Sequence, residues 1–389
     1  MKMMRGTIET PVLIMGDYGT GNVGDDVLMT VTTRIALDCL GNSGVAVNIG
    51  KPEQVPEWAA PARYISLVDY QVIKARNLIY GGGGQFFSFL NVGKIKKRTF
   101  RQRLARIFRG EVGKEQFKKW LHDTTLGSSY SLEASRHGAF CVGVGPFEAG
   151  HPLNEAAWQK LSRCELLIVR DAMSHQLCVQ AGLSHALVRT DACFLRELWL
   201  DDSPLETKAG SGRVAVIFRS WRHDPAGDAY LSPLRNVVGR LRAEGLKVTL
   251  VSLARIKDKE LIEAWSDEEI IVYDPFKQSP SRFTRSLAGS FDLVVSARAH
   301  GIMLPALLGT PGICVGLEPK LENVHKMLPL GTRYWGPPFS EPELVDQVLD
   351  MLEHGEQARI NLQREVQANQ ALARRARREL ELFLREGGP

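Results

Sequence analysis

The sequence predicts an α/β protein with two Rossmann-like domains that face each other across a central cleft. Short apolar segments of strand length alternate with helical patterns along most of the 389 residues, which is typical of doubly wound parallel sheets. The alternation is interrupted at residues 201–212, where Pro, Ser, Gly and charged residues dominate, as in an interdomain linker. A chain of this length also exceeds one typical hydrophobic core, so two domains are expected.

The first domain is expected at residues 1–200 and the second at residues 213–340. In the first, apolar strands are predicted at residues 12–15, 45–49, 65–68, 78–80, 140–144 and 166–169. In the second, they are predicted at residues 214–218, 248–252, 270–273, 293–295 and 312–317. Residues 341–389 are predicted to form C-terminal helices. Two such halves with a cleft between them correspond to a glycosyltransferase-B-like arrangement.

The composition argues against nucleic-acid-binding, disulfide-bonded, zinc-binding and membrane-spanning proteins. A net charge of +5 is too small for a dedicated nucleic-acid binder. The six cysteines are scattered without a C-x-x-C pair, which favours reduced thiols over disulfides or zinc ligation. Neither a signal peptide nor an apolar run of about 20 residues is apparent. We therefore expect a cytoplasmic protein, with peripheral contact to the inner face of the plasma membrane left open.

A glycine-rich segment follows the first predicted strand and contains Gly21, Asn22 and Gly24. It fits the G-x-G-x-x-G pattern of dinucleotide sites, but the acidic residue expected about 20 positions later is replaced by Asn48 and Gly50. Asp25 and Asp26 would also repel a pyrophosphate at this helix start. We therefore expect a loop close to a sugar substrate, with Asp25 or Asp26 as a general base; a tight turn with two capping carboxylates is the alternative.

Two further segments are candidates for the substrate-binding side of the cleft. Four consecutive glycines end the strand at residues 78–80, and Gly82, Gly83 and Gly84 would let the backbone approach a ligand closely. The alternative is a packing turn under a neighbouring strand. Arg170-Asp171 ends the strand at residues 166–169 and could instead be a helix cap with a solvent-facing arginine.

The stretch at residues 292–320 carries the most chemistry. Arg298 and His300 follow an apolar strand and precede a buried helix, and Lys320 follows the next strand. Since ligands bind beyond the carboxyl ends of parallel strands, these side chains predict an anion site with a titratable imidazole. Arg219 ends the first strand of the second domain and should face the same crevice, where paired arginines suit a phosphate or a carboxylate. The sequence shows no metal-ligand cluster, and no metal is expected.

A basic segment at residues 94–109, from Lys94 to Arg109, combines eight basic residues with apolar ones at helical spacing. It could bind anionic lipid headgroups or the pyrophosphate of a lipid-linked acceptor. A solvated helix packed on the domain is the alternative reading.

Six motifs occur in the order seen in the polysaccharide pyruvyl transferases, and the chain resembles this family from about residue 12 to residue 320. They are GDYGTGNVGDD, GGGGQFF, VGVGPF, LLIVRDAMSHQLCVQAGL, VRTDACF and the run at 296–320. The resemblance implies a glycosyltransferase-B-like fold and transfer of a pyruvyl group from phosphoenolpyruvate to two hydroxyls of one sugar, giving a cyclic ketal. The family's R-x-H element corresponds to Arg298-Ala299-His300 and its later lysine to Lys320, while Ala299 replaces the usual leucine and Leu317-Glu318 a usual aromatic residue.

The residues suit this chemistry without a cofactor. Protonated His300 could deliver a proton to the methylene carbon of the enol phosphate, and Arg219, Arg298 and Lys320 could hold its phosphate and carboxylate. Asp25 or Asp26 could accept the proton of the sugar hydroxyl. Two other functions remain open. One is a glycosyltransferase that uses a nucleotide sugar and holds its ribose through Glu318 or Glu322. The other is a non-catalytic glycan-binding or assembly protein that contacts the membrane through residues 94–109.

Overall fold

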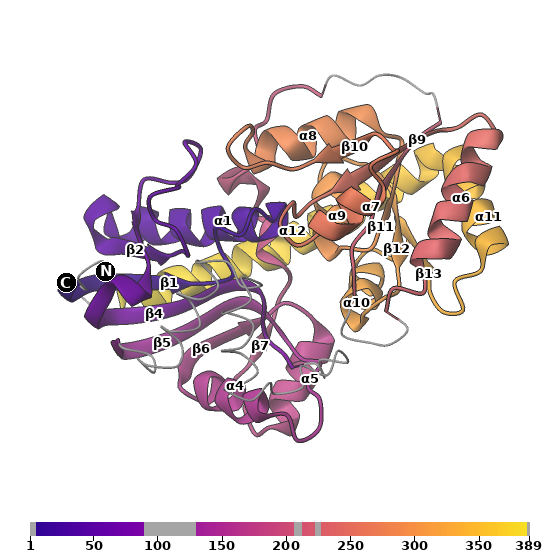
Figure 1. Cartoon of the computed structure of the whole chain (residues 1–389). Coiled ribbons are helices and arrows are strands. Elements are labelled where there is room, and N and C mark those ends of the chain that lie inside the picture. The colour runs from indigo at the N-terminus through magenta and orange to yellow at the C-terminus, as the bar shows by residue number, and fades with distance from the viewer. Residues whose placement is uncertain (1–4, 89–129, 206–211, 222–226, 387–389) are drawn as a thin grey trace, which may run out of the picture.

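The computed structural model describes residues 5–88, 130–205, 212–221 and 227–386 (Figure 1). The described residues form two lobes, each built on its own parallel sheet, and the predicted fold class is confirmed (Figure 1). The described helices include none that is both long and apolar enough to cross a membrane.

The N-terminal sheet has seven strands in the order β3-β2-β1-β4-β5-β6-β7. The two long central strands, β4 and β5, pair in parallel along most of their length, and β4 also pairs with β1. Helices α1 and α12 lie on one face of this sheet and α4 and α5 on the other (Figure 1). The strands are β1 (Arg5–Met15), β2 (Val45–Asn48), β3 (Arg63–Ile65), β4 (Tyr70–Phe86), β5 (Ser131–Val144), β6 (Cys164–Val169) and β7 (Leu187–Val188). The helices are α1 (Val23–Leu40), α4 (Pro152–Ser162) and α5 (Ala172–Gln180), with short 3₁₀ turns η1 (Asn42–Gly44), η2 (Leu67–Asp69), η3 (Ala192–Phe194) and η4 (Arg196–Leu198).

The C-terminal sheet has six strands in the order β10-β9-β8-β11-β12-β13, and its described pairings are parallel. This order brings the carboxyl ends of β8 and β11 side by side at the centre of the sheet, where a doubly wound fold places its ligand. The strands are β8 (Arg213–Ile217), β9 (Lys247–Ser252), β10 (Ile270–Val272), β11 (Leu293–Ser296), β12 (Gly312–Val315) and β13 (Thr332–Trp335). The helices are α6 (Leu231–Ala243), α7 (Lys259–Ala264), α8 (Pro280–Ser290), α9 (Ala299–Ala306), α10 (Pro319–Met327), α11 (Glu341–Glu353) and α12 (Gly355–Arg385).

A single hydrophobic core continues from one domain into the other. Apolar side chains of α1, α8, α9 and α12 pack together, so the helices at the interface share one buried cluster. Helix α12 leaves the C-terminal domain and crosses to the N-terminal sheet (Figure 1), where Asn369 accepts a hydrogen bond from the Thr190 hydroxyl at 2.7 Å. At the start of α1, the Val23 amide donates to the Leu253 carbonyl at 3.1 Å, so backbone contacts also join the two domains.

The glycine run at residues 81–84 differs from the expected loop. It continues β4 and pairs with β5, with Gly83 opposite Val142 and Gly84 opposite Gly143. Gly82 and Gly83 have φ angles of 72° and 77°, which residues with a Cβ rarely adopt. The glycines therefore let the strand deviate locally while it keeps its place in the sheet.

Candidate active site

An interdomain cavity of about 260 Å³ lies between the carboxyl edges of the two sheets. Segments from both domains line it: the β1–α1 loop, the glycine run, and the residues that follow β6, β8, β9, β11 and β12. The sequence prediction that these edges meet at one site therefore agrees with the geometry. The lining residues are Asp17, Tyr18, Asn22, Asp25, Gly82, Gly83, Gly84, Gln85, Phe87, Arg170, Arg219, Trp221, Leu253, Lys257, Arg298, Ala299, His300, Glu318 and Lys320.

His300 lies in the first turn of α9, directly after the carboxyl end of β11. Its Nε2 is 3.4 Å from Oδ1 of Asp191, a fully buried carboxylate that also contacts Nη1 of Arg170 at 3.2 Å. Burial alone would raise the pKa of Asp191, but the charges of His300 and Arg170 outweigh it and lower that pKa well below the usual range. Asp191 therefore stays ionised, and its carboxylate orients the imidazole through Nε2.

Two predicted glycines make close approaches to side chains of the other domain. A Cβ on Gly24 would lie 2.1 Å from Nδ1 of His300, so the start of α1 packs directly on the imidazole. A Cβ on Gly84 would lie 2.8 Å from Nζ of Lys320. By contrast, Gly21 lies near Pro275 and is not among the residues that line the cavity. The backbone at Gly24 and Gly84 therefore makes close approaches, but to the side chains of His300 and Lys320, which it helps to position.

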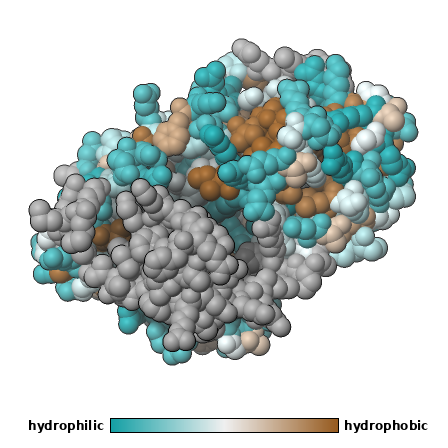
Figure 2. Space-filling view, in the orientation of Figure 1, coloured by the Kyte–Doolittle hydropathy of each residue, from teal (hydrophilic) through white to brown (hydrophobic). Residues whose placement is uncertain are grey.

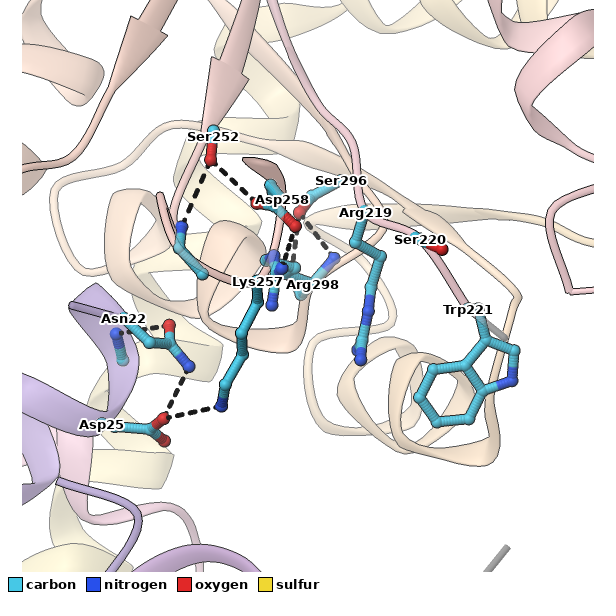
Figure 3. A network of polar contacts seen from close by, with 12 residues as sticks. Asn22, Asp25, Arg219, Ser220, Trp221, Ser252, Lys257, Asp258, Ser296 and Arg298 are labelled. Carbon is cyan, nitrogen blue, oxygen red and sulfur yellow. Dashed lines mark hydrogen bonds and ion pairs between the residues drawn. The ribbon is translucent and has the colours of Figure 1, made fainter. Parts of the chain in front are cut away.

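The two aspartates of α1 occupy different environments. Asp25 lines the cavity, accepts a hydrogen bond from the Asn22 amide at 2.7 Å and lies 3.7 Å from Nζ of Lys257 (Figure 3). Burial raises the pKa of Asp25, and Lys257 offsets part of that rise. Asp26 lies outside the lining and accepts a hydrogen bond from the Tyr273 hydroxyl at 2.9 Å. The structure thus leaves Asp25 as the candidate base and places Asp26 at a contact between the domains, because successive helical residues point in different directions.

The predicted donor-binding cations are paired with buried carboxylates. Arg298 forms an ion pair with Asp258, and burial together with Arg219 lowers the pKa of Arg298 (Figure 3). Nη1 of Arg219 is 2.7 Å from Oε1 of Glu318, whose other oxygen is 3.6 Å from Nζ of Lys320. Burial would raise the pKa of Glu318, but Lys320 and Arg219 lower it. Each cation is therefore fixed by a carboxylate.

Five cationic side chains and three carboxylates line the cavity. Two further buried carboxylates, Asp191 and Asp258, pair with the lining Arg170 and Arg298. Within the described part of the chain, Nε of Arg219 and Nε of Arg298 are buried without a hydrogen-bond partner.

Sequence comparison agrees with this geometry. A sequence model of polysaccharide pyruvyl transferases matches residues 22–319, which is more than half of the chain and includes the lining residues from Asn22 to Glu318. The chain belongs to the polysaccharide pyruvyl transferase family. A search of curated protein sequences gave no significant match.

Among solved structures, the family member resembles sugar-nucleotide enzymes in fold. A Listeria monocytogenes protein assigned as a UDP-N-acetylglucosamine 2-epimerase has a TM-score of 0.53 at 12% identity, with 99% of this chain and 98% of that one covered. The Neisseria meningitidis UDP-GlcNAc 2-epimerase bound to UDP-GlcNAc scores 0.50 at 9% identity, covering 97% and 100%. HepE of Anabaena in complex with UDP scores 0.50 at 11% identity, covering 98% and 100%. At such identities the likeness establishes the glycosyltransferase-B-like fold alone.

Arg170 and Asp171, which were predicted either to bind substrate or to cap a helix, have different environments in the structure. Arg170 is buried and lines the cavity in this pyruvyl transferase family member, so the solvent-facing alternative is wrong for it. Asp171 is the N-cap of α5 and accepts a hydrogen bond from the Ser174 amide at 2.8 Å. It is not among the lining residues, and its role as a helix cap accounts for it.

One group of side chains has the spacing of a metal site. Ligand atoms of Asp191, Cys193 and His300 lie within 4.8 Å of one another. Burial raises the pKa of the Cys193 thiol well above its ordinary value, so it stays protonated, and Arg170 already contacts Asp191. A cation fits poorly beside a neutral thiol and a guanidinium. The expectation of a site without metal stays a prediction.

Sequence reasoning missed four charged residues of the site. Asp17 stands in the β1–α1 loop, within the GDYGTGNVGDD motif, and lines the cavity. Asp191 stands in the VRTDACF motif, just beyond β7, and the carboxyl-edge argument that selected His300 could have selected it too. Lys257 and Asp258 follow β9 in a segment rich in lysine and acidic residues, which reads as an ordinary exposed turn. The predicted basic segment from Lys94 to Arg109 lies outside the described residues.

Proposed function

We propose that this protein transfers the pyruvyl group of phosphoenolpyruvate to two hydroxyls of a sugar in a bacterial surface or exopolysaccharide precursor. The first hydroxyl oxygen bonds to C2 of the enol phosphate while the methylene carbon takes up a proton and becomes a methyl group. The C2–O bond to phosphate then breaks, the second hydroxyl oxygen bonds to C2, and a cyclic ketal and inorganic phosphate result. The two sugar hydroxyls lose one proton each. In the overall balance, one proton is gained by the methyl carbon and the other is released.

The observation that carries the proposal is the pairing of His300 with Asp191 beside a cavity lined by five cationic side chains. The carboxylate orients the imidazole through Nε2, and an imidazolium is the form that can protonate carbon. Asp25 lies on the opposite domain, and its raised pKa makes it a stronger base toward a sugar hydroxyl. An acid and a base from different domains suit a donor and an acceptor that enter from the two sides of the cleft.

Arg219, Arg298 and Lys320 are proposed to bind the phosphate and carboxylate of the donor. A small doubly charged anion needs several donors in fixed positions, and the ion pairs with Glu318 and Asp258 fix the guanidinium groups of Arg219 and Arg298. The glycine run and Arg170 would lie on the acceptor side, where a lipid-linked oligosaccharide is the proposed acceptor class. A cytoplasmic location is proposed as well, in keeping with six free thiols.

Direct binding of the donor tests the proposal without knowledge of the acceptor. Thermal unfolding would be followed in titrations with phosphoenolpyruvate, UDP, GDP and NAD, on the wild type and on Arg219→Gln. Ligand at about 100 times its dissociation constant adds roughly 2.7 kcal/mol, enough for a clear shift of the midpoint. Phosphoenolpyruvate is expected to stabilise the wild type, with at least about tenfold weaker apparent binding in the variant. Arg235→Gln, which alters an exposed ion pair with Asp267 in the same domain, is the matched control.

The competing function, glycosyl transfer from a nucleotide sugar, has less support in the site. Glu318, the expected ribose ligand, is committed to Arg219 and Lys320, while Glu322 pairs with Lys326 on the exposed side of α10. Stabilisation by UDP or GDP and not by phosphoenolpyruvate would nonetheless favour that reaction and refute the pyruvyl transfer proposed here.

A further inference from the structure

Two surface turns beside the cavity expose large apolar side chains. Ile256 follows β9 and is 71% exposed, and Phe276 follows β10 and is 64% exposed. These are the highest exposures among the large hydrophobic residues that the structure describes. In Figure 2, patches of hydrophobic residues interrupt the otherwise hydrophilic surface of the C-terminal domain.

The two side chains belong to one patch. β9 and β10 pair in parallel with Ser252 opposite Val272, and each apolar residue stands four positions beyond its paired strand residue. An ion pair of 3.0 Å between Arg255, which precedes Ile256, and Asp274, two residues before Phe276, joins the two turns. Since neighbouring strands lie about 4.8 Å apart, turns that leave them at the same offset stay adjacent.

Cationic side chains flank the patch, and two of them are paired: Arg255 with Asp274 at 3.0 Å and Lys257 with Asp17 at 2.5 Å. In the turns at residues 255–258 and 275–278, the exposed side chains are two apolar and three cationic ones, and the carboxylate within them, Asp258, is buried. The five exposed residues are Arg255, Ile256, Lys257, Phe276 and Lys277. Apolar tips surrounded by Lys and Arg are the composition that binds an anionic bilayer surface.

Hydrogen bonds fix the backbone of the turn that carries the exposed side chain of Phe276. The Phe276 amide donates to Asp274 at 3.1 Å, and the Pro275 carbonyl accepts from the Trp58 indole of the N-terminal domain at 2.7 Å. Both contacts fix the backbone of this turn, so the phenyl ring stays in solvent without contacts that would bury it. A protein partner generally covers about 800 Å² on each side, far more than two side chains provide, whereas interfacial insertion needs only a few apolar tips.

We propose that this patch, hereafter the membrane patch, binds the surface of an anionic bilayer. Lys257 is adjacent to Ile256 and also lines the interdomain cavity, where its Nζ lies 2.5 Å from Asp17. A bilayer at the membrane patch therefore meets the rim of the cavity and presents lipid-linked molecules to it. This contact is distinct from the basic segment at residues 94–109 and does not depend on the pyruvyl reaction.

Vesicle co-sedimentation tests the proposal without donor or turnover. The full chain would be mixed with phosphatidylcholine vesicles that contain or lack phosphatidylglycerol. We expect binding to the anionic vesicles that weakens with added salt, and a decrease in affinity of about tenfold or more in Ile256→Ser/Phe276→Ser. A separate Lys277→Glu variant should weaken binding about fivefold or more, since each basic residue near an anionic surface contributes about 1 kcal/mol.

A matched control uses apolar residues of similar exposure outside the two turns of the membrane patch. Leu330 and Leu382 are each 59% exposed; Leu330 precedes β13, and Leu382 lies near the end of α12. Leu330→Ser/Leu382→Ser should bind vesicles like the wild type. Equal binding by the wild type and Ile256→Ser/Phe276→Ser would overturn the proposal and transfer the contact to another segment, and failure of the wild type to bind anionic vesicles would overturn it outright. Thermal unfolding of each variant shows that its fold is kept.

Discussion

The buried carboxyl of Asp26 gives the sharpest prediction, because its effect on stability depends on pH. Asp26 is 2% exposed and lies at the contact between the domains, where it accepts a hydrogen bond from Tyr273. Burial raises the pKa of Asp26 to about 7; the hydrogen bond from Tyr273 lowers it and the charge of Asp25 raises it further. Asp26→Asn replaces it with a neutral side chain of the same shape that can still accept from Tyr273. We expect the variant to be more stable than the wild type at alkaline pH and equally stable at acid pH.

The sign and size follow from linkage between protonation and folding. The carboxyl shifts from an ordinary value of 3.8 to about 7, so the folded protein holds the proton more tightly than the unfolded chain. Its contribution to stability is therefore complete below the unfolded pKa, falls as the pH rises between the two values, and is lost above the folded one. A shift of about three pKa units corresponds to about 4 kcal/mol at 1.36 kcal/mol per unit, which is an upper limit for the gain in Asp26→Asn.

Thermal unfolding at about pH 5 and about pH 9 measures this difference. The midpoint of Asp26→Asn should exceed that of the wild type by several degrees at the higher pH, and the gap should shrink toward the lower pH. Asp267→Asn, which alters an exposed carboxylate paired with Arg235, should show no such trend. A constant offset at both pH values, or a less stable variant at about pH 9, would refute the claim that Asp26 is a buried, desolvated carboxyl.

Three further predictions concern the cavity. His300→Gln and Asp25→Asn should each decrease turnover of phosphoenolpyruvate with acceptor by about 10²–10⁴, while Asp26→Asn stays within a few fold of the wild type; equal losses in Asp25→Asn and Asp26→Asn would contradict the separation of the two aspartates. Gly24→Ala should lower turnover at least about tenfold because its methyl group would lie 2.1 Å from Nδ1 of His300, whereas a Cβ on Gly239 of α6 meets nothing within 4 Å, so Gly239→Ala should keep full activity. Arg298→Ala should lose about 3–5 kcal/mol of stability in denaturant unfolding, because Asp258 is left buried and unpaired. The double variant Arg298→Ala/Asp258→Ala should regain stability but not binding of phosphoenolpyruvate, and recovery of binding would show that Arg298 does not contact the donor.

The features that the sequence could predict share one physical origin. Apolar segments bounded by Gly, Arg or His identify where parallel strands end, and strand ends of a doubly wound sheet meet at one edge. This argument placed Arg219, Arg298, His300 and Lys320 correctly in one cavity without any knowledge of contacts between the domains. The glycine segments were found by a separate argument. Runs of glycine indicate that the backbone approaches a neighbouring group closely, whether that group is a ligand or a side chain.

What the sequence could not predict depends on how the domains face each other. The pairing of His300 with Asp191 joins residues from different sheets, and the separation of Asp25 from Asp26 follows from the helical rotation between adjacent residues beside Tyr273. Asp258 stands in a lysine-rich turn whose composition suggests solvent, yet its own side chain is buried against Arg298. Neither hydrophobic periodicity nor a motif contains this information, because it resides in the relative placement of two separately predictable halves.

The buried carboxylates explain how so many cations can share one small cavity. Without partners, Arg219, Arg298 and Lys320 would repel each other and pay the full cost of burial, and the pKa of Lys320, which burial lowers, would fall further. Glu318 and Asp258 hold the cations in place and offset that repulsion. An incoming dianion therefore meets oriented donors whose reorganisation has already occurred during folding, which is the condition under which charged groups stabilise a transition state most strongly.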